Sequence, residues 1–334
     1  MIKEQMEIHP EIIEKNEKEE TNLKSPINSI RITKEQINII SDSKFASRNI
    51  NLPNIEYPGI LQITVISSQS MRFGTKIKID KMGLMEKSLR NIKSNIIYFG
   101  YIDDLNLNKD NNENSIDYLL PQKKFENEDN EDIKFSGRFF RIYFNTKNLH
   151  YYLRDLGNCL GTYVKINEPT ILKNDDMINI GDTYLIFKFE TSLKKENFEN
   201  KENDIENNNI KDLLINDIIN IHVAELNHNK ETQSRNFQFD SNKKIIRIGR
   251  KKNNNDIELK DSLVSKINCN IQYNGINGWF INDGDETITH IGESKKKQST
   301  NGTWILAIDD FRIYENMVFK CNFNIFKCHF IKQN

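Results

Sequence analysis

Three short polar motifs between residues 248 and 304 carry side chains that can hold an oxyanion. They centre on Arg250, on Ser265 and on the pair Thr300-Asn301. An arginine in a turn presents a rigid fork of N–H donors that matches phosphate oxygens. The serine and threonine hydroxyls add two further donors. If folding brings these residues together, they form a binding site for a phosphate group.

The composition indicates folded domains separated by polar segments. The chain has 334 residues, 37% hydrophobic residues and a mean hydropathy of −0.66, yet it contains 19 Phe and 11 Tyr. This length fits two domains with linker to spare. The net charge is −1, but residues 241–334 hold 12 Lys and 3 Arg against 6 Asp and 4 Glu, a local charge of +5. Such a basic stretch favours an anionic ligand.

The distribution of strand-forming residues predicts four segments. Residues 1–55 form a polar tail that is disordered or docks onto a partner, and residues 193–215 form a polar linker. Residues 56–192 and 216–334 consist of short β-branched and aromatic runs broken by Asn, Asp and Gly, which is typical of strands and turns. Since sustained helical periodicity is absent, the predicted class is all-β, with two sandwiches in tandem.

The two strand-rich regions resemble each other. In the first, Ser136 precedes Gly161-Thr162 by 25 residues; in the second, Ser265 precedes Gly302-Thr303 by 37 residues. The difference predicts an insertion of about a dozen residues at Asp285–Gln298 in the second region. We therefore interpret the chain as a tandem repeat of one sandwich.

In the second region the motifs follow one another in a definite order. They are Ile248-Gly249-Arg250, Asn255-Asp256-Ile257-Glu258-Leu259, Val264-Ser265-Lys266 and Ser299-Thr300-Asn301-Gly302-Thr303. This order resembles the forkhead-associated (FHA) domain family, whose pattern is a Gly-Arg turn, an Asn-Asp-Ile-x-Leu strand, a Ser-Arg-x-His loop and a Ser-x-Asn-Gly-Thr loop. The resemblance implies a β-sandwich that binds a phosphothreonine-containing protein.

The resemblance also implies a role for each residue. Arg250, Ser265 and Thr300 would surround the phosphate, Asn301 would hold the backbone of the bound peptide, and Lys266 would add a polar contact. Four further residues would be structural: Gly249, Asn268, Gly302 and Thr303. Asn268 stands where the family has a histidine that braces the serine loop. Asn is shorter and directs its hydrogen bonds differently, which leaves open whether Ser265 is held as well.

Five lysines surround these motifs in the sequence: Lys251, Lys252, Lys295, Lys296 and Lys297. If the loops converge as in the family, these cations would support phosphate capture and favour acidic or multiply phosphorylated partners. Alternatively, they are ordinary solvated loop charges.

The first region lacks most of the phosphate-binding residues. It keeps Ser136, but Tyr101 replaces the arginine, Phe139 the histidine, and Cys159 and Leu160 the Thr-Asn pair. Since hydrogen bonds to charged groups contribute about 1.5–3 kcal/mol, loss of the arginine alone predicts binding weaker by about ten- to a few-hundred-fold. We expect this copy to serve packing or another interface.

The sequence favours a binding module over an enzyme. It contains no Gly-rich nucleotide loop, no histidine paired with a nucleophile, and no CxxC motif among its four cysteines, so we expect no catalysis, cofactor, metal or small-molecule substrate. No apolar run reaches a membrane span, and the N-terminal residues lack a signal-peptide pattern. We expect a soluble intracellular protein, in the nucleus or in the cytoplasm, including cytoskeletal or ciliary locations.

The alternative function is a phosphate-independent assembly protein that uses both sandwiches as docking blocks. A nucleic-acid partner is not expected, because the basic stretch lacks interleaved aromatic residues. Steep loss of affinity with salt, without any need for phosphothreonine, would distinguish nucleic-acid binding.

Overall fold

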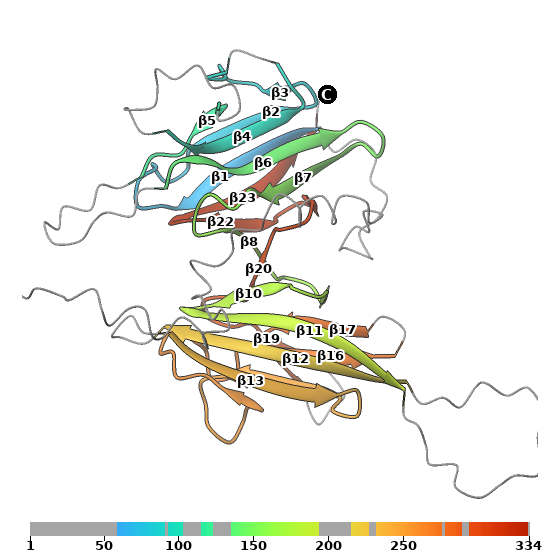
Figure 1. The fold of residues 1–334 in the computed structure, drawn as a ribbon. Coiled ribbons are helices and arrows are strands. Elements are labelled where there is room, and N and C mark those ends of the chain that lie inside the picture. Colours follow the sequence, from blue (N-terminus) through green and yellow to red (C-terminus); the bar gives the residue numbers. More distant parts are fainter. Residues whose placement is uncertain are drawn as a thin grey trace, which may run out of the picture. The chain divides into compact units, whose positions relative to one another are not determined.

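The computed structural model describes residues 59–90, 93–102, 115–122, 135–193, 215–226, 232–275, 278–288 and 294–332. All the regular secondary structure in these residues is β-strand (Figure 1), which confirms the predicted all-β class. The predicted tail 1–55 and nearly all of the predicted linker 193–215 lie outside the described residues. In the described part of the chain, no helix has the length and apolar character to cross a bilayer.

One sandwich combines strands from both ends of the described chain. Its first sheet has the order β3-β2-β1-β23-β22-β8, and its second sheet has the order β5-β4-β6-β7-β21. In Figure 1 the red strands β22 and β23 lie beside the blue strand β1. The strands are β1 (Ile60–Ser67), β2 (Lys76–Asp80), β3 (Gly83–Leu84), β4 (Ile96–Tyr101), β5 (Tyr118–Leu119), β6 (Gly137–Asn145), β7 (His150–Asp155), β8 (Thr162–Lys165), β21 (Phe311–Arg312), β22 (Val318–Cys321) and β23 (Asn324–Ile331).

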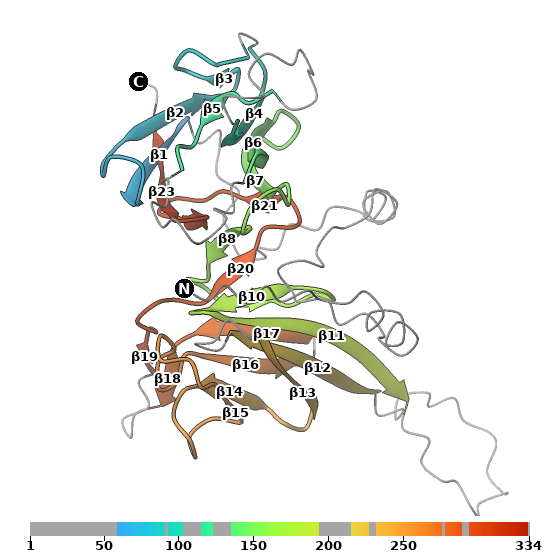
Figure 2. The ribbon, with the colours of Figure 1, turned by 60° about the vertical axis from the view of Figure 1, so that its left-hand side comes forward.

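The other sandwich is formed by the middle of the chain. Its sheets have the orders β13-β12-β11-β10-β20 and β15-β14-β16-β17-β9, and a hairpin, β18-β19, is attached (Figure 2). The strands are β9 (Thr170–Ile171), β10 (Met177–Ile180), β11 (Thr183–Leu193), β12 (Ile215–Leu226), β13 (Thr232–Asp240), β14 (Ile245–Gly249), β15 (Ile257–Glu258), β16 (Cys269–Asn274), β17 (Gly278–Asp283), β18 (Asp285–Ile288), β19 (Ser294–Lys297) and β20 (Trp304–Leu306). The β18–β19 hairpin coincides with the predicted insertion.

The chain passes between the two sandwiches twice, after β8 and after β20, and these two strands pair with each other. Lys165 lies opposite Trp304 in the antiparallel pair β8–β20, which joins the two larger sheets into one of eleven strands. The chain leaves the first sandwich after β8 and returns to it after β20.

The pairing exchanges the last strands of the two sequence repeats. In a simple tandem, β10–β11 would close the first sandwich and β22–β23 would close the second. Instead, β1 pairs with β23, and β12 pairs with the whole of β11. Likewise β7 pairs with β21 and β17 pairs with β9. Each sandwich therefore takes its closing strands from the other repeat.

The predicted domain limits do not follow this pairing. The ranges 56–192 and 216–334 each contain strands of both sandwiches. The second sandwich is one continuous segment, 170–306, whereas the first consists of 60–165 together with 311–331.

Aromatic side chains from both repeats share the core of the first sandwich. Phe140 of β6 stacks on Phe99, and its ring centroid lies 5.5 Å from that of Phe319 and 6.3 Å from that of Phe326. All four are at most 1% exposed. Fully burying such a side chain contributes about 1.5–3 kcal/mol, so the exchanged strands are an integral part of this core. Buried and half-buried residues alternate along β1, with the period of two expected for a strand with one buried face.

Candidate functional site

Arg250 directly follows β14 and lies against the loop that carries Ser265. Its backbone N–H donates to the Ser265 carbonyl over 2.9 Å, and its side-chain Nε donates to the Val264 carbonyl over 3.0 Å. Within the described residues, no protein group accepts a hydrogen bond from its two Nη atoms. Because the residue is exposed, these donors are available to a ligand.

Ser265 and Thr300 come together from loops 35 residues apart. The Thr300 N–H donates to Ser265 Oγ over 2.9 Å, and the Ser265 hydroxyl lies 3.4 Å from Thr300 Oγ1. The second contact is longer than an ordinary O–H···O bond of 2.5–3.0 Å. A phosphate oxygen could therefore replace it at little cost. The structure thus brings Arg250, Ser265 and Thr300 into one connected group.

Asn301 extends this group toward the serine loop. Its Nδ2 donates to the Leu263 carbonyl over 2.7 Å, and its own carbonyl accepts from Trp304 Nε1 over 2.8 Å. Gly302, which follows, has a φ of +81°, a conformation that favours glycine, and its N–H donates to Ser299 Oγ over 2.9 Å. The side chain of Asn301 is exposed, so its Oδ1 can accept a hydrogen bond from a bound peptide.

Asn268 braces the serine loop from inside the sandwich. It is fully buried; its Oδ1 accepts from the Ser265 N–H over 3.1 Å, and its Nδ2 donates to Thr303 Oγ1 over 3.1 Å. Thr303, also fully buried, donates to Asp283 Oδ1 over 2.7 Å, and Asp283 Oδ1 accepts from Ser299 Oγ over 2.6 Å. The asparagine thus links the two loops directly.

Replacing Asn268 with Ala should destabilise the protein by about 1–3 kcal/mol, because the part-buried Ser265 N–H and the buried Thr303 Oγ1 would lose their partner. The free energy of unfolding, measured with denaturant, tests this. The control is Asn254→Ala, since Asn254 is exposed and its only described bond uses the backbone N–H. A change below about 0.5 kcal/mol for Asn268→Ala, the range usual for surface substitutions, would contradict the bracing role.

The remaining predicted residues are distributed unevenly around the site. A Cβ at Gly249 would lie 2.5 Å from the Lys266 carbonyl oxygen, so only glycine allows this approach of strand and loop. Three exposed lysines lie near Arg250. Lys251 and Lys252 follow it in the chain, and the Lys266 carbonyl accepts a hydrogen bond from the Lys251 N–H. The lysines of the β19 strand, residues 295–297, pair through their backbone with β18. Their electrostatic role stays a prediction.

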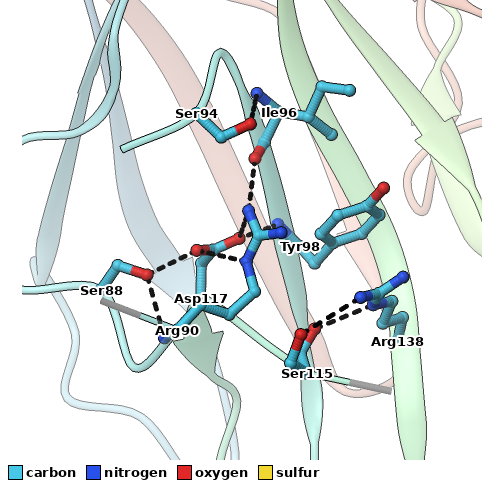
Figure 3. Close-up of polar contacts among 8 residues, drawn as sticks. All are labelled: Ser88, Arg90, Ser94, Ile96, Tyr98, Ser115, Asp117 and Arg138. Atoms are coloured by element: carbon cyan, nitrogen blue, oxygen red, sulfur yellow. Dashed lines mark hydrogen bonds and ion pairs between the residues drawn. The ribbon is translucent and has the colours of Figure 1, made fainter. Parts of the chain in front are cut away.

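In the first sandwich, Asp117 next to β5 forms an internal ion pair with Arg90 (Figure 3). Asp117, 3% exposed, accepts from Ser88 Oγ, from the Tyr98 N–H over 2.9 Å and from Arg90 Nε over 2.8 Å. Arg138 donates to the Ser115 carbonyl over 2.8 Å and lies over the Tyr98 ring, 3.8 Å from its centroid. These arginines stabilise the sheet from positions that differ from that of Arg250, whose counterpart is Tyr101.

Three residues that support the site had no role in the sequence interpretation. Asp283 accepts from both Ser299 and Thr303, and Asn255 Nδ2 donates to the carbonyls of Lys251 and Lys266 over 2.8 Å each. Asp261 contacts the first repeat. Asn255 belongs to a motif visible in the sequence, whereas the contact of Asp261 with the first repeat depends on the strand exchange.

The cysteines are all free thiols. Cys159 Sγ of the first repeat lies 3.6 Å from Cys321 Sγ of the second, and this contact together with burial raises the pKa of the Cys159 thiol. Within the described residues there is no group of three or more His, Cys, Asp or Glu side chains that could hold a metal ion.

Comparison with protein families assigns both repeats. The family model of the FHA domain matches residues 113–181 and residues 246–318. No curated protein and no solved structure gives a significant match to this chain. The first match includes both β8 and β9, and the second includes both β20 and β21, so each match contains strands of both sandwiches. Each therefore follows a sequence repeat and not a sandwich. FHA domains are protein-interaction modules that generally mediate phosphothreonine-dependent contacts. Two regions of the chain thus match the FHA domain family, which is consistent with two copies of the domain in tandem.

Proposed function

We propose that the second FHA copy binds a phosphothreonine-containing protein and that the chain acts as a non-catalytic adaptor. The observation that carries this proposal is the connected group of Arg250, Ser265 and Thr300, with both guanidinium Nη atoms available. A phosphothreonine carries about −1.5 to −2 charges and three acceptor oxygens. The Nη atoms and the two hydroxyls can donate hydrogen bonds to those oxygens, and the positive guanidinium attracts the negative phosphate.

The remainder of the site suits an extended peptide. Asn301 is held by the Leu263 carbonyl through Nδ2, so its Oδ1 can accept a backbone N–H of the ligand. Leu263, 49% exposed, lies beside it and offers an apolar contact. Lys251, Lys252 and Lys266 would increase the rate of capture of an acidic ligand.

The test is binding of the full chain to phosphothreonine peptides and to the same peptides without phosphate. We expect the phosphate to tighten binding by at least about tenfold, the value of one charge-assisted hydrogen bond. Equal binding of both forms, or binding of neither by the folded chain, would favour the phosphate-independent docking protein instead.

A further inference from the structure

The strand exchange places a turn of the first repeat against the serine loop of the second. This turn joins β10 to β11 and contains Gly181 and Asp182. The Asp182 N–H donates to Asp261 Oδ2 over 2.6 Å, and the Thr183 hydroxyl lies 3.4 Å from the same oxygen. In a simple tandem this turn would belong to the other sandwich, so Asp261 would meet a different partner.

From Asp261 the contacts lead directly to two residues of the proposed ligand site. Asp261 Oδ1 accepts from the Leu263 N–H over 2.8 Å, and its backbone carbonyl accepts from the Val264 N–H over 3.2 Å. The carbonyl of Leu263 then accepts from Asn301 Nδ2 over 2.7 Å, and the carbonyl of Val264 accepts from Arg250 Nε over 3.0 Å. One short loop thus orients both Arg250 and Asn301, and its carboxylate is held by the first repeat.

The packing around this contact leaves little room for another arrangement. Thr183 is fully buried and Val264 is 1% exposed. Gly181 has a φ of +58°, and a Cβ at this position would lie 2.4 Å from Asp261 Oδ2 and 3.1 Å from Leu263 Cβ. The absence of a side chain at Gly181 is therefore what permits the turn to approach the loop.

We propose that the first FHA copy is a positioning element for the phosphothreonine site of the second, acting through the contact of the β10–β11 turn with Asp261. This inference rests on the proposed function of the second copy. It assigns a role to the copy that lacks the phosphate-binding residues: its closing hairpin holds the loop that aims Arg250 and Asn301 at the ligand. Asp261 and Gly181 are positioning residues, since neither is required to touch the ligand.

The test is Gly181→Ala in the full chain, matched with Gly74→Ala. Both glycines belong to the first repeat and have positive φ, so both substitutions impose similar backbone strain. A Cβ at Gly74 would meet nothing within 4 Å, whereas a Cβ at Gly181 would push against Asp261. Two quantities are measured for each variant: the Kd for a phosphothreonine peptide, and the amide hydrogen exchange of residues 263–265.

We expect Gly181→Ala to weaken phosphothreonine binding by about three- to tenfold. The reason is that Arg250 and Asn301 would be less well oriented, which weakens their hydrogen bonds to the ligand. Exchange at residues 263–265 should become faster while exchange in β1 is unchanged, which a general loss of stability would not produce. Gly74→Ala should change neither quantity more than about twofold, within the variation usual for surface substitutions.

The outcomes separate this inference from the proposed function. Tight phosphopeptide binding by the wild type that is equally tight in Gly181→Ala would overturn the positioning role and leave the proposed function intact. Should the wild type bind no phosphothreonine peptide, the proposed function fails, and exchange at residues 263–265 decides only whether the β10–β11 turn holds the serine loop. Unchanged exchange in Gly181→Ala would then overturn it, and faster local exchange would support it.

Discussion

A chain shortened to residues 216–334 is expected to lose its cooperative fold and its phosphothreonine binding, whereas residues 168–308 are expected to keep both. The first of these fragments follows the second sequence repeat, but it lacks β9, β10 and β11 and retains β21–β23, which belong to the other sandwich. Residues 168–308 contain every strand of the second sandwich and all the predicted phosphate-binding residues.

The expected effect is large because the missing strands supply core side chains. Ile178, Ile180, Leu185 and Phe187 are each fully buried. At about 1.5–3 kcal/mol for each buried side chain, their removal is comparable with the whole stability of a domain, about 5–15 kcal/mol. Loss of β11 would also expose the long edge of β12, a surface prone to aggregation.

Thermal unfolding of the two fragments, followed by peptide binding, tests this prediction. A cooperative transition for 216–334 together with none for 168–308 would mean that the closing strands are not exchanged.

Mild oxidation of the full chain gives an independent check, since the Sγ atoms of Cys159 and Cys321 lie 3.6 Å apart. Peptide mapping should find a disulfide between them, which a Cys321→Ser variant should not form.

Replacing Arg250 with Ala in the full chain is expected to weaken phosphothreonine binding by about ten- to a few-hundred-fold. The estimate follows from the roughly 1.5–3 kcal/mol that a hydrogen bond to a charged group contributes. The side chain also donates to the Val264 carbonyl, so its removal would loosen the serine loop in addition to removing the phosphate donors. The loss should therefore lie in the upper part of this range.

Two variants make the Arg250 experiment specific. Arg250→Lys keeps the charge but loses the planar fork of donors, so it should recover only part of the affinity. Arg247→Ala removes the same charge from β14, three residues before Arg250. It should change the Kd by less than about threefold, because a partly exposed charge that does not contact the ligand is screened by salt. If Arg247→Ala and Arg250→Ala weakened binding equally, the effect would be one of overall charge, and the proposed role of Arg250 would be wrong.

Much of this protein follows from its sequence alone. Alternating apolar residues separated by Asn, Asp and Gly are local patterns, so they identified the all-β class and the internal repeat without any knowledge of pairing. The repeat comparison also located the insertion that forms the β18–β19 hairpin. The motif order around Arg250, Ser265 and Thr300-Asn301 identified the family and the residues that the fold brings together.

Only the tertiary structure decided which hairpin closes which sandwich. The hairpins β10–β11 and β22–β23 have the same strand pattern and the same tight turn, so each could complete either sandwich, as in domain swapping. The choice depends on interactions between distant residues, such as Phe140 with Phe319 and Phe326, which no local pattern encodes.

The roles of Asn268 and Asp261 likewise required the structure. The sequence showed only that Asn268 replaces a histidine; whether its short amide could reach both loops depended on the distance between Ser265 and Thr303 in the folded protein. Asp261 could not be connected with Gly181 and Asp182, because these residues belong to different repeats and meet only after the strands have been exchanged. Local chemistry thus specified the proposed binding groups, and long-range packing specified what holds them.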